Sequence, residues 1–121
     1  MQQQIHTRQT GFHYERLAGS YLEKQGYRIR EYNFRCPYAE IDIIAENGIY
    51  LIFCEVKYRK GNNITRSLEA VDIRKQRRIS RAALFYMSRH HLSEIPCRFD
   101  VIGITDTQIQ HIKNAFYYMG G

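Results

Sequence analysis

The chain has 121 residues, of which 44% are hydrophobic and 25% are charged. This length is typical of one domain, and the composition is sufficient for a buried core, so a disordered tail is excluded. The longest apolar stretches are far shorter than the ~20 residues that a membrane-spanning helix needs. Residues 1–4 contain no apolar signal-peptide core. Cys36, Cys54 and Cys97 are odd in number and widely spaced, which argues against a disulfide framework or a zinc site. We therefore expect a cytoplasmic protein with reduced thiols and no membrane association.

The basic residues of the chain are concentrated in one segment. Eighteen Lys and Arg residues against twelve Asp and Glu residues give a formal net charge of +6. Residues 57–91 contain ten of the basic residues and two of the acidic ones, so the remainder of the chain is slightly acidic. A strongly basic segment on an acidic body indicates an anionic partner, and nucleic acid is one such partner.

Hydrophobic periodicity predicts seven main elements along the chain. In order they are a helix at residues 7–25, strands at 27–34, 38–46 and 49–58, a helix at 68–90, and strands at 97–105 and 108–112. Residues 113–118 add a short helix or strand, and residues 1–6 are expected to be flexible. The order α-β-β-β-α-β-β predicts an α/β fold of the α+β kind, in which helices pack on a central mixed sheet. We expect residues 1–121 to form a single domain.

The connection between the second and third predicted strands is a hairpin signal. Asn47 and Gly48 separate the two runs, and Asn-Gly favours a two-residue turn because both central residues need a positive φ. Such a turn places Glu46 opposite Ile49.

This hairpin places charged side chains together. Asp42 and Glu55 become diagonal neighbours, with Cβ atoms roughly 7 Å apart or less. Since side chains alternate along a strand, the charged residues of both strands point to the same face. These residues are Glu40, Asp42, Glu55 and Lys57.

Three carboxylates and an amine on one face of two otherwise apolar strands require a compensating charge. Like charges at this spacing repel, and Lys57 supplies one counter-charge while a divalent cation would supply more. Hard cations such as Mg²⁺ take carboxylates, waters and phosphate oxygens as ligands. The set Asp42, Glu55 and Lys57 therefore suits a metal site that hydrolyses phosphodiesters.

A structural interpretation of the same residues is also open. The hairpin could lie at a sheet edge, where its charges would form ordinary cross-strand pairs in solvent. Residues 51–57, however, place Glu55 and Lys57 at the end of a hydrophobic run that is typical of a central, buried strand. This favours the functional interpretation for Asp42, Glu55 and Lys57, whereas Glu40 fits an auxiliary or a salt-bridging role equally well.

Two further polar residues lie on the predicted helices. Glu15 is at the border of the apolar face of the first helix, where it could reach inward to a metal or pair with a basic neighbour. Gln76 shares a face with Ile79 and Ala83 of the second helix. It could orient a water or a phosphate, but a buried amide satisfied by the backbone is slightly favoured.

The basic segment forms two candidate phosphate-binding surfaces. Residues 59–67 are predicted to be a mobile basic loop. Arginines in the second helix recur at i, i+3, i+4 and i+7, which aligns them on one face. The candidate nucleic-acid-binding residues are Arg59, Lys60, Arg66, Arg74, Lys75, Arg77, Arg78 and Arg81.

The combination of these residues resembles the restriction-endonuclease-like nuclease superfamily. The resemblance rests on Glu55-Val56-Lys57, on Asp42 across the hairpin and on Glu15 in the opening helix. Within that superfamily the chain is similar to archaeal Holliday junction resolvases, and it resembles the bacterial YraN-like family more closely. The matching segments lie at residues 11–27, 39–45, 53–57, 69–71, 75–78, 98–102, 111–112 and 115–116. Tyr14 stands where the family usually has a small residue, and Ile41 where the superfamily often has proline.

The resemblance implies a restriction-endonuclease-like core and roles for the matching residues. Asp42, Glu55 and the carbonyl of Val56 would bind Mg²⁺ or Mn²⁺, and Glu15 would complete or adjust the metal site. Lys57 would position the attacking water or stabilise charge in the transition state. The implied activity is that of a metal-dependent endodeoxyribonuclease. Similarity to the resolvases further implies branched or junction DNA as substrate and a two-fold symmetric homodimer.

Two other functions are compatible with the sequence. A nuclease-like fold could hold DNA or RNA without cutting it, because many proteins keep a fold and lose its catalytic activity. A small basic protein could also assemble on ribosomal RNA through aromatic and basic residues on a sheet face. The three charges on the hairpin argue against both, since a non-catalytic face has little reason to keep them and carboxylates repel phosphate. We therefore expect a structure-selective nuclease.

Overall fold

The computed structural model of the chain describes residues 2–62 and 71–118. The described elements are α1 (Gln2–Lys24), β1 (Arg28–Arg35), β2 (Glu40–Glu46), β3 (Leu51–Tyr58), α3 (Ile73–Arg89), β4 (Cys97–Ile104) and β5 (Ile109–Phe116). This succession confirms the predicted order α-β-β-β-α-β-β. Neither helix in the described part of the chain is long and apolar enough to cross a membrane.

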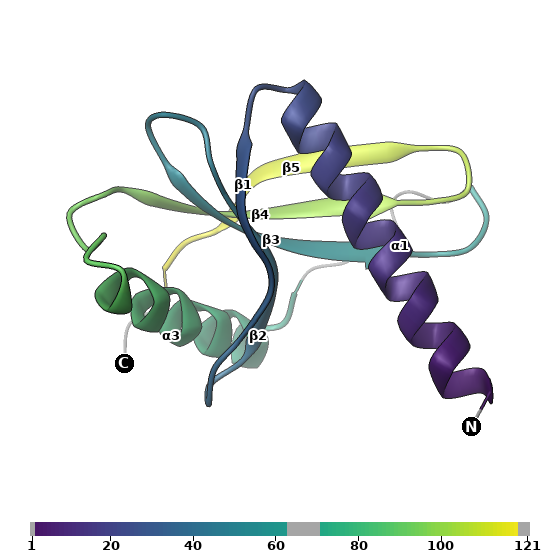
Figure 1. The fold of residues 1–121 in the computed structure, drawn as a ribbon, viewed down its shortest axis with the longest axis horizontal. Coiled ribbons are helices and arrows are strands. Elements are labelled where there is room, and N and C mark those ends of the chain that lie inside the picture. The colour runs from purple at the N-terminus through teal and green to yellow at the C-terminus, as the bar shows by residue number, and fades with distance from the viewer. Residues whose placement is uncertain (1, 63–70, 119–121) are drawn as a thin grey trace.

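The described strands form one mixed sheet in the spatial order β1-β2-β3-β4-β5 (Figure 1). β3 and β4 are parallel, whereas the other neighbouring strands are antiparallel. Parallel neighbours need a crossover connection, and α3 lies in the one between β3 and β4. The central position of β3 agrees with its hydrophobic sequence, because both of its faces are covered.

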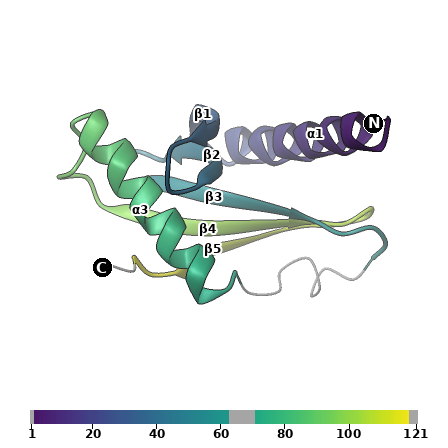
Figure 2. The same ribbon diagram turned by 90° about the horizontal axis from the view of Figure 1, so that it is seen from below.

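Each face of the sheet carries its own apolar cluster. Ile44 and Phe53 belong to the cluster that includes Ile79 and Tyr86 of α3. Residues of alternate position in the same strands, such as Ile52, pack instead with Ala18 and Leu22 of α1. α1 and α3 therefore cover opposite faces, and Figure 2 shows α3 crossing the strands on its side. Alternation along the strands supplies both cores.

The β2–β3 turn lies one residue later than predicted, which shifts the register of the two strands by two residues. Its central residues are Gly48 and Ile49, because the amide of Asn47 donates to the carbonyl of Tyr50 and Glu46 pairs with Leu51. The Asn47 side chain accepts hydrogen bonds from the amides of Ile49 and Tyr50, at 3.0 and 2.8 Å. Of the two central residues, only Gly48 has a positive φ, +95°, as in hairpin turns with glycine at the first central position. The expected pairing of Glu46 with Ile49 was wrong, because the Asn47 side chain caps the turn from outside.

A shift of two residues leaves every side chain on its predicted face, since the side-chain period of a strand is two. The new register brings Asp42 directly across from Glu55, instead of diagonal to it. The regular pairing stops one step earlier, at Ile43 and Cys54. The expected common face is thus retained for Asp42, Glu55 and Lys57, although the assumed register was incorrect.

The helix bounds also differ from those predicted. The first helix begins at Gln2, not at residue 7, because no proline or glycine interrupts the chain before Gly11. The second helix was expected from residue 68. It begins at Ile73, and the carboxylate of Asp72 caps it by accepting from the amide of Lys75 at 2.9 Å. Residues 68–70 lie outside the described part of the chain.

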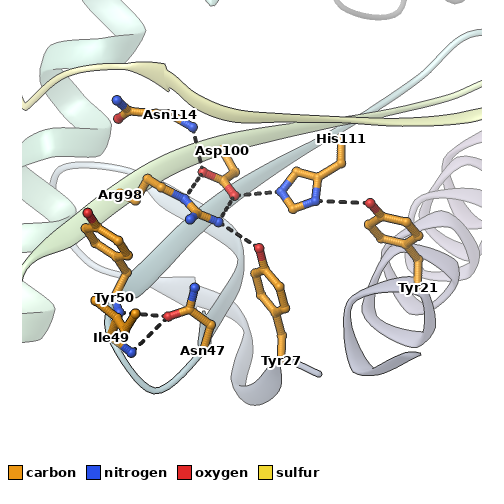
Figure 3. A network of polar contacts seen from close by, with 9 residues as sticks. All are labelled: Tyr21, Tyr27, Asn47, Ile49, Tyr50, Arg98, Asp100, His111 and Asn114. Atoms are coloured by element: carbon orange, nitrogen blue, oxygen red, sulfur yellow. Dashed lines mark hydrogen bonds and ion pairs between the residues drawn. The ribbon is translucent and has the colours of Figure 1, made fainter. Parts of the chain in front are cut away.

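A buried polar network ties α1 to the sheet on the face that α1 covers (Figure 3). The Asp100 carboxylate is fully buried in β4 and accepts two hydrogen bonds from the Arg98 guanidinium, each 2.9 Å long. His111 Nε2 lies 2.6 Å from the same carboxylate, and the amide of Asn114 donates to it at 2.9 Å. On its other side, His111 Nδ1 lies 3.2 Å from the Tyr21 hydroxyl of α1. The network therefore links β4, β5 and α1.

Candidate functional site

β2 and β3 separate at Asp42, and a pocket forms where they part. The Asp42 carboxylate takes the place of a strand partner, because its Oδ2 accepts from the Val56 amide at 2.8 Å. The pocket has a volume of about 440 Å³. It is lined by Tyr38, Ala39, Glu40, Asp42, Glu55, Val56, Lys57, Lys75 and Arg78, and we call it the acidic pocket. All four charged hairpin residues singled out in the sequence thus line one pocket.

A local reversal in β2 lets both helices reach this point. Ile43 packs in the cluster under α1, whereas Ile41, two residues earlier, packs in the cluster under α3. Regular alternation would keep both on one face, so the strand turns over at Asp42. On the neighbouring strand β1, Asn33 has a φ of 55°, a left-handed conformation that asparagine tolerates better than most residues. The twist of the β1–β2 pair exposes Asp42 to α1 and α3 together.

Glu15 approaches Asp42 from the α1 side and does not line the acidic pocket. Its side chain forms hydrogen bonds with Asn33 and Asp42. Its second oxygen, Oε1, is buried and has no hydrogen-bond partner. Burial is the main cause that raises the pKa of Glu15 above its usual value. An unpartnered carboxylate oxygen is costly, so this atom marks a position where a cation or a proton would stabilise the protein.

Asp42 carries the most perturbed carboxyl group of the acidic pocket. Burial, followed by the nearby charge of Glu55, raises its pKa from 3.8 to about 8, against the effect of the Val56 amide. The hydrogen bond with Glu15 raises the pKa of Asp42 and lowers that of Glu15. Both carboxyl groups thus have raised pKa values and share a hydrogen bond, an arrangement in which one proton relieves the repulsion between them.

Two lysines flank the buried carboxylate of Glu55. Lys75 Nζ lies 2.8 Å from Glu55 Oε2, and Lys57 Nζ lies 4.0 Å from the same oxygen. Burial and the adjacent charge of Lys75 lower the pKa of Lys57. Burial opposes the charge of Lys75 too, but its ion pair with Glu55 prevails and raises the pKa of Lys75. Of the two amines, Lys57 therefore has the lowered pKa and releases its proton more easily.

The donor set of the site fits a hard divalent cation in kind. Asp42 and Glu55 offer carboxylate oxygens, and Val56 offers a backbone carbonyl; Mg²⁺ prefers such ligands. Within residues 11–62 and 71–118, no three His, Cys, Asp or Glu side chains are already gathered as a cation cage. The Glu55 carboxylate is paired with Lys75, and Glu15 contacts Asp42 from α1, outside the pocket. The unpartnered oxygen of Glu15 and the raised pKa of Asp42 both indicate a deficit of positive charge.

The two auxiliary candidates occupy different places. Glu40 lines the acidic pocket and also pairs with Arg35, with 3.3 Å between Oε2 and Nε. Gln76 does not line the pocket, and its amide nitrogen donates to the carbonyl of Val71 at 2.8 Å. This contact matches the structural role that was slightly favoured for Gln76.

Tyr14, the residue that precedes Glu15, stacks on Tyr58 at the end of β3. The ring centroids are 3.7 Å apart and the planes are nearly parallel, at 11°. The large side chain is thus accommodated outside the acidic pocket, and Glu15 still reaches Asp42.

The described candidate phosphate-binding residues lie on two segments, the end of β3 and α3. Arg59 and Lys60 are exposed just after β3. The arginines of α3 are exposed on the helix face opposite its buried side; we call Arg74, Arg77, Arg78 and Arg81 the arginine face. Arg78 also lines the pocket itself. Arg66 lies outside the described residues.

Sequence reasoning missed two side chains that hold this site together. Lys75 was assigned only to phosphate binding, yet it binds Glu55. Its helical position contains the signal, because Lys75 aligns with the buried residues Ile79 and Tyr86 at i+4 and i+11, not with Arg74. Asn33, which contacts Glu15, has no such signal, since its role depends on the twist of β1.

The close approach of α1 to β1 depends on Gly19. A Cβ at this position would collide with the ring and hydroxyl of Tyr32. We therefore expect Gly19→Ala to lower the free energy of unfolding by roughly 1–3 kcal/mol. Gly11→Ala is the matched control, because a Cβ there meets nothing within 4 Å, and it should stabilise the helix by about 0.5–1 kcal/mol. Urea denaturation of both variants measures the difference, and equal stabilities would contradict the packing described here.

Comparison with known proteins places the chain in a family. Residues 14–104 match the uncharacterised protein family UPF0102. A UPF0102 protein of Thermodesulfovibrio yellowstonii is 45% identical over 85% of this chain and 91% of its own length. A relative from Shewanella oneidensis is 45% identical over 84% and 94%, and one from Lachnoclostridium phytofermentans is 47% identical over 84% and 87%. The expected YraN-like membership is thereby confirmed, and the chain belongs to the UPF0102 family.

Proposed function

We propose that this protein is a metal-dependent nuclease that cleaves phosphodiester bonds in DNA and selects its substrate by shape. The observation that carries the proposal is the acidic pocket, in which the carboxyl groups of Asp42 and Glu55 lie together with the amines of Lys57 and Lys75. Neighbouring carboxyl groups in a pocket destabilise the fold unless a bound ligand compensates their negative charge. Lys57, Lys75 and Arg78 line the same pocket, and their positive charges attract a phosphate.

Asp42, Glu55 and the Val56 carbonyl are the donors that would hold Mg²⁺ or Mn²⁺, with Glu15 supporting Asp42 from α1. The cation would supply positive charge to the phosphate oxygens and lower the pKa of a bound water. For Glu55 to bind the cation through Oε2, that oxygen would have to leave Lys75, whose amine could then contact the phosphate.

Lys57 is the residue that we assign to water activation or to charge stabilisation. Its pKa is lowered by burial and by Lys75, so it exchanges a proton more readily near neutral pH than an ordinary lysine does. It lies on β3 two residues from Glu55, which keeps its amine on the same face of the strand.

The arginine face and the exposed residues Arg59 and Lys60 would hold the nucleic acid through its phosphates. These contacts carry no sequence information, so shape would decide which substrate binds. Branched DNA and a two-fold symmetric homodimer remain part of this proposal, because two acidic pockets related by symmetry could cut two strands of one junction.

A cleavage assay tests the proposed activity. Labelled four-way junctions, flaps, duplexes and single strands are incubated with Mg²⁺, with Mn²⁺ or with EDTA. We expect cation-dependent cleavage by the wild-type protein and a rate about 10²–10³-fold lower for Lys57→Ala, as for removal of one charge-stabilising group. Lys113→Ala, which removes an exposed lysine of β5, should cleave at the wild-type rate. Unimpaired cleavage by Lys57→Ala would overturn the assignment of the site.

One contact favours a second candidate function, that of a nucleic-acid-binding protein without catalysis. The 2.8 Å ion pair between Lys75 and Glu55 occupies a carboxylate that the cation would need. Binding of the same substrates without cleavage under either metal would support this function and eliminate the first.

A further inference from the structure

An apolar groove lies next to the acidic pocket and has no role in the chemistry proposed above. Its volume is about 590 Å³, which is within the range of small-molecule sites. It is lined by Tyr38, Arg81, Leu84, Phe85, Ser88 and Arg89, and we call it the aromatic groove. Tyr38 lines the acidic pocket as well, so the two depressions share a wall.

The aromatic groove continues the arginine face of α3. Its helical residues begin at Arg81, and Leu84, Phe85 and Ser88 follow at i+3, i+4 and i+7, so they lie on one side of the helix. This is the exposed side that carries Arg78, not the side that packs on the sheet. The chain therefore places apolar side chains in line with its phosphate-binding surface.

Two hydrophobic residues of the groove are exposed to solvent, whereas Phe85 is partly buried against the core. Tyr38 is 43% exposed and Leu84 is 49% exposed. The Tyr38 and Phe85 ring centroids are 6.2 Å apart at an interplanar angle of 65°, and the Arg89 guanidinium lies 5.9 Å from the Phe85 centroid. Aromatic faces beside arginines are the arrangement on which unpaired bases stack in single-stranded nucleic acids.

We propose that the aromatic groove binds an unpaired nucleobase of the strand whose phosphate lies in the acidic pocket. The inference rests on the proposed function and specifies its substrate class. The lining contains two arginines and no acidic residue, which complements the phosphates on either side of such a base. Tyr38 borders both the groove and the acidic pocket, so the two sites are adjacent.

The separation of the two sites suits one strand. Seven residues of helix separate Arg78 in the acidic pocket from Phe85 in the groove, which corresponds to about 10 Å along the axis. A stacked strand advances ~3.4 Å per nucleotide, so this is about three nucleotide steps. A base inside a duplex cannot reach the rings, whereas a base at a bulge, branch or strand end can. The groove thus provides a physical basis for selection by shape.

The same apolar surface could receive a protein. A hydrophobic protein anchor, however, requires neither the two arginines nor the common wall with an acidic pocket. The charge and the continuity favour nucleic acid, and the experiment below separates the two.

Binding is measured in EDTA, so that cleavage does not interfere. The probes are a 20-base-pair DNA duplex with one unpaired 2-aminopurine, the same duplex with that base paired, and the corresponding RNA duplexes. We expect the wild-type protein to bind the unpaired probe about 10-fold more tightly, as one stacked base contributes, and to change its 2-aminopurine fluorescence. Tyr38→Ala and Leu84→Glu should abolish the preference, and Tyr38→Phe should retain it because the ring remains.

Leu17→Glu is the control for the added charge, since Leu17 is a similarly exposed leucine of α1 that does not line the groove; it should keep the preference. Equal, measurable binding of paired and unpaired probes by the wild-type protein would overturn the inference, and the proposed function would stand. Binding of neither probe would overturn both. A preference that survives Tyr38→Ala and Leu84→Glu would also overturn the inference, because the unpaired base would then bind outside the aromatic groove.

Discussion

Replacing Asp42 by asparagine is expected to abolish metal-dependent cleavage and to stabilise the metal-free fold. Asparagine imitates the protonated carboxyl, because its carbonyl oxygen can accept from the Val56 amide and its amide nitrogen can donate to Glu15. It lacks the negative charge that a cation requires, so the cleavage rate should fall by about 10³-fold or more, which corresponds to ~4 kcal/mol. A carboxylate that is needed for activity but is buried away from water lowers stability, so its replacement should remove activity and increase stability.

The stability difference depends on pH in a defined direction. The folded protein keeps a proton on Asp42 up to a pKa of about 8, whereas the unfolded chain releases it near the ordinary value of 3.8. Between these values the folded state binds more protons, so the wild-type free energy of unfolding decreases as the pH rises. The Asp42→Asn variant has no ionisable group at this position, so its free energy of unfolding does not decrease for this reason. Its advantage should therefore grow from about pH 4, reach several kcal/mol near pH 8, and level off above it.

Thermal or urea denaturation in EDTA at pH 5 and pH 8.5 measures this advantage. Added MnCl₂ should stabilise the wild-type protein at pH 8.5 and leave Asp42→Asn unchanged, because a ligand stabilises only the state that binds it. A variant that is less stable than wild type at pH 8.5 would contradict the account of Asp42. Cleavage that survives in Asp42→Asn would remove Asp42 from the active site.

Asp100→Asn should have the largest destabilising effect of any single polar substitution discussed here. Burial by itself would raise the pKa of Asp100, but hydrogen bonds from His111, Arg98 and the Asn114 amide lower it overall. The asparagine variant leaves the Arg98 guanidinium, whose side chain is only 12% exposed, without its buried counter-charge. Breaking one partner of such a pair costs about 3–5 kcal/mol, which is a large part of the stability of a small domain.

Asp106→Asn is the matched control for Asp100→Asn. Asp106 also accepts two hydrogen bonds, from the Tyr58 hydroxyl and the Gly61 amide, but it is exposed on the protein surface. Its replacement should change the unfolding midpoint in urea only slightly, because water can replace the lost contacts. Similar midpoints for the two variants would show that the network in Figure 3 contributes little to the fold.

The fold was largely predictable because strands and helices leave periodic patterns. The buried run of β3 and the exposed arginines of α3 each follow from side-chain period alone. Turn geometry was less accessible. The Asn47-Gly48 pair suggested one register, yet the Asn47 side chain satisfies the amides of Ile49 and Tyr50 and moves the turn by one residue. A local hydrogen bond outweighed the preference of a dipeptide.

The buried network shows a different limit. Arg98, Asp100 and His111 lie in segments by which the chain resembles its family, but nothing in their spacing shows that they meet. They are brought together by pairing of β4 with β5 and by packing of α1 on that face. Contacts between distant segments depend on topology, and the local pattern does not contain it.

For the candidate site, the sequence by itself determined that Asp42, Glu55 and Lys57 share one face, because a period of two survives a register error of two residues. Only the tertiary structure decided what meets them there. The reversal of β2 at Asp42 lets Glu15 approach from α1. The docking of α3 on the opposite face of the sheet from α1, which is the face of Glu55, brings Lys75 to Glu55. The physical reason is that side-chain direction is a local property of a strand, whereas charge, burial and pKa arise from every element packed around it.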